Sequence, residues 1–375
     1  MSRSGKASKY PPDARPPREI TDAFRHRHPD DERYLRQALE TGLTGTSSIV
    51  ERYERKLAER YGMRHVLAVS SGAAAVTVAL DGITWEPGDE IIVPPTCPIC
   101  TVLPILSRGL KPVFCDVRPH NFGLDPDDLA RVISPRTRGI IEVPMWGYPS
   151  RADELREIAR AHGLPLILDL AHCHMTRLNG RWLAEYGDIA CFSTHEGKFM
   201  STGEGGFVMT NDADRDAKMR AYTRFGNLDG IHFGLNYKLG GLQAAVGLAR
   251  LEALDRHVET RARNRQYILE RLQNPHVREL PICEGGVVNG YALLLQVVRG
   301  DGRRFVEHLH THGVPSDIKK YDNRPLYEYP LLAAYQRDCK NSAALLRSLT
   351  TVPLHSDLSL EDLQHIISTV NAYEC

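Results

Sequence analysis

The sequence has no excess of charge of either sign, because it contains 47 Lys and Arg residues against 47 Asp and Glu residues. Nothing in the average composition therefore draws the chain to nucleic acid or to anionic lipid. It also lacks any apolar run near the roughly 20 residues that a membrane helix needs. Its first residues are polar and proline-rich, without the apolar segment of a secretory signal. We expect neither nucleic acid nor a membrane among its partners.

Cysteine is sparse, with eight residues in 375, and its spacing is not that of a dense disulfide scaffold. This pattern favours a reducing compartment, and we expect a cytoplasmic protein. We detect no internal repeat, so we do not expect a repeat architecture. The 42% hydrophobic content is ordinary for a globular chain, and the length suggests about two domains.

The order of apolar runs predicts an α/β protein. Residues 1–18 lack apolar periodicity and are expected to form a flexible arm. From residue 19 to 255, short apolar runs alternate with amphipathic stretches, which predicts a large domain with a mostly parallel sheet. Strands expected at 188–194 and 206–211 are joined too closely for a parallel crossover, so the sheet should be mixed. Residues 256–375 should form a smaller α+β domain.

Capping patterns predict where two helices begin. Ser48-Ile49-Val50-Glu51 matches a capping box and predicts a helix from Ser48 to a stop at Gly62. Ser150, with Asp153 three residues later, predicts a second helix that reaches about His162.

Three segments carry residue types that are used in catalysis or in ligand binding. Gly72, in Ser70-Ser71-Gly72-Ala73, opens a helix after an apolar strand; such a helix start can bind a phosphate, although small residues also serve packing. Asp169 ends a buried strand, where it either pairs with a cation or caps a helix. Lys198 precedes a glycine-rich turn and is either the amine of a Schiff base or a solvated side chain.

Together these segments resemble, in order and spacing, the DegT/DnrJ/StrS group of sugar aminotransferases. The resemblance runs from about residue 20 to the C-terminus and includes Thr202-Gly203-Glu204-Gly205-Gly206 and Gly234-Leu235-Asn236-Tyr237-Lys238. Members of this group are pyridoxal-phosphate enzymes of fold type I. The resemblance therefore implies a pyridoxal 5'-phosphate cofactor and a fold type I architecture.

The resemblance also implies a role for each matching residue. Lys198 would hold the cofactor as a Schiff base and then move protons as general base and acid. Asp169 would pair with the pyridinium nitrogen, and His172 would lie near the ring oxygen. The phosphate would be bound by four groups, those of Gly72, Ala73, Ser193 and Asn236. Asn236 would come from a second subunit, so a homodimer is expected to complete the site.

Several positions depart from the pattern of the group. Ala73 stands where most members have Thr or Ser, so one hydroxyl contact to the phosphate is missing. Thr96-Cys97-Pro98-Ile99 contains none of the aromatic residues that stack on the cofactor in other members. Pro98 or a neighbour must then cover the ring, or Trp146 or Phe199 takes over the stacking. Leu168 replaces the usual acidic residue before the pyridinium carboxylate, and Lys238 replaces a common Arg.

Cys97 and Cys100 have the spacing of half a zinc site. The candidate for the other half is His172-Cys173-His174, where the resemblance already gives His172 another role. We therefore expect buried thiols and no metal.

The predicted function is amino transfer from an amino acid, with glutamate as the group's usual donor, to a keto sugar or keto-cyclitol. It would serve sugar, cell-surface or antibiotic biosynthesis. One alternative is a pyridoxamine-phosphate-dependent sugar dehydratase of the same group, but those enzymes replace the lysine with histidine. Another is a non-catalytic regulatory protein on the same fold. Lys198 and Asp169 together favour transamination.

Overall fold

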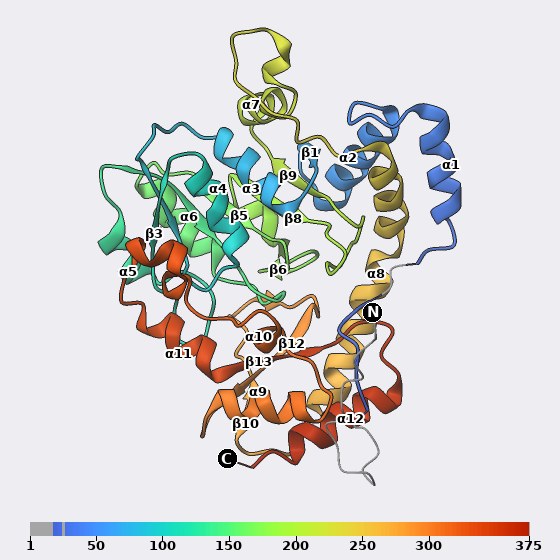
Figure 1. Cartoon of the computed structure of the whole chain (residues 1–375), viewed down its shortest axis with the longest axis vertical. Coiled ribbons are helices and arrows are strands. Elements are labelled where there is room, and N and C mark those ends of the chain that lie inside the picture. The colour runs from blue at the N-terminus through green and yellow to red at the C-terminus, as the bar shows by residue number, and fades with distance from the viewer. Residues whose placement is uncertain (1–17, 25–26, 375) are drawn as a thin grey trace, which may run out of the picture.

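The computed structural model describes residues 18–24 and 27–374. Its centre is a seven-stranded sheet in the order β1-β9-β8-β5-β4-β2-β3 (Figure 1). The strands are β1 (His65–Val69), β2 (Glu90–Val93), β3 (Lys111–Phe114), β4 (Thr137–Glu142), β5 (Leu166–Asp169), β8 (Ile189–Ser193) and β9 (Gly206–Thr210). Both pairings of β9 are antiparallel, and the other four pairings in the sheet are parallel. The predicted mixed sheet is confirmed.

Helices cover both faces of this sheet, so successive strand residues enter different cores. On β5, Leu166 and Leu168 pack into one apolar cluster with Tyr53 and Leu57. Ile167 between them packs into the other cluster. Burial on both faces explains why these strands are continuously apolar in sequence. The helices of this part are α1 (Asp31–Thr41), α2 (Ser48–Tyr61), α3 (Gly72–Asp81), α4 (Ile99–Ser107), α5 (Pro126–Val132), α6 (Ala152–Ala161) and α7 (Ala213–Thr223).

A smaller α+β part follows the long helix α8 (Gly241–Leu269), and lies at the bottom of Figure 1. Its antiparallel sheet has the order β10-β12-β13 and packs with α9 and α12 around a third apolar cluster. Its elements are β10 (Val277–Glu279), β12 (Ala292–Val297), β13 (Leu349–Pro353), α9 (Gly302–Thr311), α10 (Asp317–Lys320), α11 (Lys340–Ser348) and α12 (Leu360–Asn371). A further small sheet joins β11 (Gly286–Val287), β6 (Arg177–Leu178) and β7 (Arg181–Trp182).

Helix α8 runs without a break through residue 255, where the boundary between the domains is predicted. The sequence around that position has no glycine or proline to end a helix, so one helix belongs to both parts. The flexible arm predicted for residues 1–18 lies outside the described residues except for Arg18. None of the helices in the described residues has both the length and the hydropathy to cross a membrane.

The two predicted capping boxes are wrong. Helix α2 does begin at Ser48, but its N-cap residue is Ser47, whose hydroxyl donates to the carbonyl of Thr44 and caps no helical N–H. Helix α6 has Arg151 as its N-cap residue, again without a side-chain cap. Ser150 is instead fully buried, where its side chain interacts with the carboxyl group of Glu142. Tertiary packing has overridden the local capping preference in both cases.

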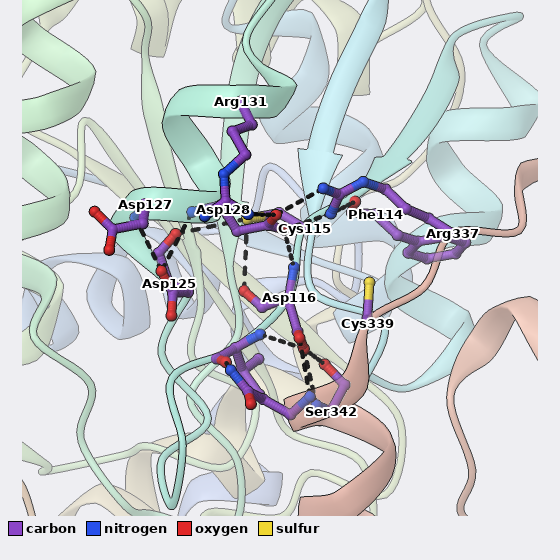
Figure 2. A network of polar contacts seen from close by, with 12 residues as sticks. Phe114, Cys115, Asp116, Asp125, Asp127, Asp128, Arg131, Arg337, Cys339 and Ser342 are labelled. Atoms are coloured by element: carbon purple, nitrogen blue, oxygen red, sulfur yellow. Dashed lines mark hydrogen bonds and ion pairs between the residues drawn. The ribbon is translucent and has the colours of Figure 1, made fainter.

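A polar network fastens the small part to the sheet (Figure 2). Arg337 donates to both carboxylate oxygens of Asp128, which belongs to α5. Asp116 follows β3 and accepts hydrogen bonds from the backbone N–H groups of Asn341 and Ser342, at the start of α11. The network therefore joins segments more than 200 residues apart in the chain.

Candidate active site

A cavity of about 530 Å³ lies where the parallel strands end. Such an edge is where α/β sheets usually bind ligands. The walls are segments that follow β1, β2, β4, β5 and β8, together with part of the small domain. Six of the seven predicted site residues line it, namely Gly72, Ala73, Asp169, His172, Ser193 and Lys198.

Asp169 brings a carboxylate to the cavity from the end of β5, with only 7% of the residue exposed. One oxygen accepts a hydrogen bond from the hydroxyl of Thr101 (2.7 Å), and the other accepts one from the N–H of Ala171 (3.2 Å). No Lys or Arg among the described residues forms an ion pair with it. Burial therefore raises the pKa of Asp169. A buried carboxylate without a cation fits a ligand that presents a protonated ring nitrogen.

Lys198 lies in the connection between β8 and β9. Its backbone N–H donates to the carbonyl of His195, and its Nζ lies 5.6 Å from the centre of the Tyr291 ring. Burial lowers the pKa of the Lys198 ammonium. A lowered pKa increases the share of neutral amine, which is the form that attacks a carbonyl carbon.

The start of α3 and the end of β8 lie against each other and form a cradle of backbone amides and a hydroxyl. The Ser71 hydroxyl accepts from the N–H of Ala74, which leaves the amides of Gly72 and Ala73 without acceptors inside the helix. A Cβ on Gly72 would lie 2.7 Å from the Cβ of Ser193, so glycine is required for this approach. The amides and the Ser193 hydroxyl together suit a phosphate group.

Gly206 allows the two sides of the cradle to meet. It pairs with Val69 of β1 on one side and with Ser193 of β8 on the other. A Cβ at this position would lie 2.5 Å from the carbonyl oxygen of Phe192 and 2.6 Å from that of Ser71. The glycine-rich turn in the sequence thus has a definite packing reason.

His172 is a hydrogen-bond donor to the cavity. Its Nδ1 accepts the backbone N–H of Trp146 (3.2 Å), so the proton of the neutral ring resides on Nε2. Burial lowers the pKa of His172 well below its usual value, which keeps the ring neutral. The ring stacks on Tyr291, with centroids 4.5 Å apart. A neutral donor held in this way fits the predicted neighbour of a ring oxygen.

Small side chains and one indole line the cavity as candidates to cover the cofactor ring. Thr96, Cys97 and Pro98 line the cavity, and so does Trp146. Phe199 is not among the lining residues; its ring lies 4.4 Å from the guanidinium of Arg261. Of the two aromatic candidates named from the sequence, the structure leaves Trp146.

Asn236 does not line the cavity of its own chain. Its side-chain oxygen accepts a hydrogen bond from the Lys238 ammonium at 2.6 Å on the exposed side of the molecule. The segment just before it exposes three large apolar residues, Leu228 (81%), Ile231 (82%) and Phe233 (72%). An apolar surface of this kind is typical of an interface.

Sequence reasoning missed the wall supplied by the small domain. Its residues are Tyr291, Asp317, Tyr321, Asn323, Arg324, Leu326, Tyr329 and Leu346. They lie in stretches without a motif, and no local signal marks them. Only the docking of the small domain on the sheet edge brings them to the cavity.

The chain is similar to a family of aminotransferases and to several of its curated members. Residues 26–371 match the profile described as the DegT/DnrJ/EryC1/StrS aminotransferase family. GDP-perosamine synthase of Caulobacter vibrioides is 34% identical over 61% of this chain and 64% of its own length. The dTDP-3-amino-3,4,6-trideoxy-alpha-D-glucose transaminase of Micromonospora megalomicea is 33% identical over 67% of this chain and 68% of its own. The chain thus aligns with about two thirds of these curated relatives.

A solved structure shows the same fold. DesV of S. venezuelae, crystallised in complex with a ketimine intermediate, has a TM-score of 0.84 and 26% identity. The match covers 91% of this chain and 94% of that chain. The predicted fold class is confirmed.

Proposed function

Because the chain belongs to the DegT/DnrJ/EryC1/StrS aminotransferase family, we propose that it moves an amino group from an amino acid to a keto sugar or keto-cyclitol. Membership confirms the family predicted from the sequence and its pyridoxal-phosphate-dependent aminotransferase class. The observation that carries the proposal is the meeting of Asp169, Lys198 and the phosphate cradle in one cavity.

Pyridoxal phosphate, when bound, supplies an electron-accepting ring that can carry an amino group between two substrates. Lys198 would hold the cofactor and would serve as the base and then the acid that moves a proton. Asp169 would keep the ring nitrogen protonated, because its buried carboxylate lacks a cationic partner in the chain. His172 would donate a hydrogen bond to the ring oxygen from Nε2.

The phosphate would be held by the amides of Gly72 and Ala73 and by the hydroxyl of Ser193. We include Asn236 of a second subunit among the phosphate ligands. The exposed apolar residues before Asn236, and its position outside its own cavity, support a homodimer whose sites are each built from two chains. The expected cytoplasmic location rests on composition alone and remains a prediction.

Glutamate is the proposed donor, and the acceptor is a keto sugar or keto-cyclitol. The small groups of Thr96, Cys97 and Pro98 change the surface above the cofactor, and Ala73 offers no hydroxyl to its phosphate. These departures support an acceptor other than a nucleotide-linked hexose and a readily released aminated cofactor. If Trp146 stacks on the ring instead, an ordinary nucleotide-linked substrate fits.

Reduction with borohydride tests the cofactor assignment. The purified protein with pyridoxal phosphate should absorb in the visible range, and peptide mapping after reduction should find the label on Lys198. Addition of glutamate before reduction should remove both the colour and the label. Labelling of Lys111 or Lys238 instead would contradict the site.

A second assay tests the acceptor. Amino transfer from glutamate to a nucleotide-linked 4-keto-6-deoxyhexose and to a keto-inositol should be measured side by side, with cofactor retention followed by gel filtration. Faster transfer to the keto-inositol, with loss of aminated cofactor on the column, is expected. Fast turnover of the nucleotide sugar with full retention would assign the ordinary substrate.

A further inference from the structure

A second carboxylate reaches the cavity from the small domain. Asp317 is the first residue of α10 and lines the cavity together with Asp169 and Lys198. None of the predicted contacts to the cofactor involves it, since all residues of the chain's own cofactor site come from the large domain. Its carboxylate is therefore left for another ligand.

Asp317 is held in a fixed position. The indole Nε1–H of Trp146 donates to its Oδ2 at 2.9 Å, and its backbone N–H donates to the Thr351 hydroxyl at 2.7 Å. Trp146 is itself 2% exposed and packs edge-on against Phe122, with ring centroids 5.4 Å apart. A carboxylate anchored through such packed neighbours is suited to select a ligand geometry.

The other oxygen of this carboxylate is free to bind. Within the part of the chain that the structure describes, Oδ1 accepts no hydrogen bond and no Lys or Arg forms an ion pair with Asp317. The nearby Lys320 is paired with Asp22. Burial raises the pKa of Asp317, as expected for a carboxylate short of partners. A hydrogen-bond donor on the ligand would supply the missing partner.

We propose that Oδ1 of Asp317 accepts a hydrogen bond from a hydroxyl group of the keto acceptor and thereby selects hydroxylated acceptors. This inference rests on the proposed amino transfer and identifies the acceptor group that the site recognises. An acceptor without that hydroxyl leaves the carboxylate desolvated and unpaired, which is how enzymes reject deoxygenated analogues strongly. Asp317 is thus a specificity residue of the acceptor half of the reaction.

The test compares three variants with wild type. Asp317→Ala should lower kcat/KM for a keto-inositol about 100-fold, the effect expected from losing a hydrogen bond to a charged group. Asp317→Asn keeps an acceptor oxygen and should recover part of this loss. Glu328→Ala, an exposed acid outside the cavity, is the matched control and should change nothing. The glutamate half-reaction, followed by loss of visible absorbance, should change far less than kcat/KM for the acceptor in the two Asp317 variants.

Binding of acceptor analogues tests which group of the acceptor Asp317 recognises. Calorimetry with the inactive Lys198→Ala protein should show tighter binding of keto-inositol than of an analogue lacking the hydroxyl beside the carbonyl. Asp317→Ala in the same background should abolish that preference. Equal binding of the two ligands by the Lys198→Ala protein would overturn the hydroxyl assignment.

Two outcomes separate this inference from the proposed function. If glutamate does not discharge the colour of the wild-type protein, amino transfer itself is wrong. If glutamate does discharge the colour, two results would overturn the inference. In one, Asp317→Ala weakens the binding of the hydroxylated and the deoxygenated acceptor equally. In the other, it slows the glutamate half-reaction as much as the transfer to the acceptor, which would give Asp317 a structural role.

Discussion

Around Asp128, buried carboxylates meet a guanidinium and backbone N–H groups, whereas in the cavity Asp169 meets one hydroxyl and one amide. Burial opposes ionisation at both places. At Asp128 the hydrogen bonds from Arg337 and from the Asp116 amide outweigh burial and hold the pKa below its usual value. At Asp169 burial prevails, and the pKa is raised.

The difference separates structural charges from functional ones. The network of Figure 2 completes its own hydrogen bonds within the chain, so its charges fasten two parts of the fold. The cavity keeps Asp169, Lys198 and Asp317 without ion pairs among the described residues, so their charges await ligands. Buried charges are normally paired with a counter-ion, and an exception of this kind marks a site.

Lys198→Ala should give the largest difference between an effect on turnover and an effect on stability. We expect turnover to fall by at least about 10⁴-fold, because the group that holds the cofactor and moves the proton is gone. The free energy of unfolding of the cofactor-free protein should stay the same or rise, since a desolvated ammonium is removed. Steady-state assays and urea unfolding measure the two effects. A large loss of stability would place Lys198 with the structural charges.

Arg337→Ala should instead lower the stability of the protein. The Asp128 carboxylate would lose its cation inside the network, and the free energy of unfolding should fall by about 2 to 4 kcal/mol. Arg131→Ala is the matched control, because Arg131 contacts the same carboxylate at 3.5 Å but has a side chain 70% exposed. It should change stability by less than about 0.5 kcal/mol. Equal losses for both variants would contradict the structural role of the Arg337 contact.

The two carboxylates should also differ in their pH dependence. The lowered pKa of Asp128 stabilises the fold above the unfolded pKa, near 3.8, and this contribution disappears as the pH falls through the folded pKa. The raised pKa of Asp169 has the opposite sign, so its contribution is present below about 3.8 and is lost as the pH rises through the folded pKa.

Substitutions make this contrast measurable in cofactor-free protein by urea unfolding at about pH 2.5 and at pH 7. Asp128→Asn should destabilise more at pH 7 than at the acidic pH, where the Asp128 carboxylate no longer contributes. Asp169→Asn should stabilise at pH 7 and have little effect at the acidic pH. Added pyridoxal phosphate should stabilise wild type more than Asp169→Asn, because the cofactor pairs the carboxylate. If both variants changed the free energy of unfolding with the same sign at pH 7, the proposed difference between the Asp128 and Asp169 carboxylates would be wrong.

The smallest expected effect concerns Ala73, whose side chain is exposed at the start of α3. Ala73→Ser restores a hydroxyl beside the phosphate cradle and should tighten pyridoxal phosphate by about 0.5 to 1.5 kcal/mol. Dialysis followed by absorbance measures cofactor retention. Unchanged retention would mean that a hydroxyl at this position does not reach the phosphate.

Local sequence signals were sufficient for the strands and for much of the cavity. Apolar runs predict β8 and β9 within one residue at each end, because both faces of these strands are buried. Gly72, Asp169 and Lys198 follow such strands, and parallel strands end at one edge. Six predicted site residues therefore meet, although their roles toward the cofactor remain predictions.

Tertiary contacts decided what local signals could not. Ser150 has the side chain of a helix cap, yet folding turns it toward Glu142. Asp317 has no motif, yet docking of the small domain brings it to Lys198 and Trp146. Whether a carboxylate is neutralised or left for a ligand depends on groups that only the complete fold brings near. The sequence by itself determined the mixed sheet, the family and six residues that line one cavity. The tertiary structure decided which buried charges are paired, because the partners of each charge come from distant segments of the chain.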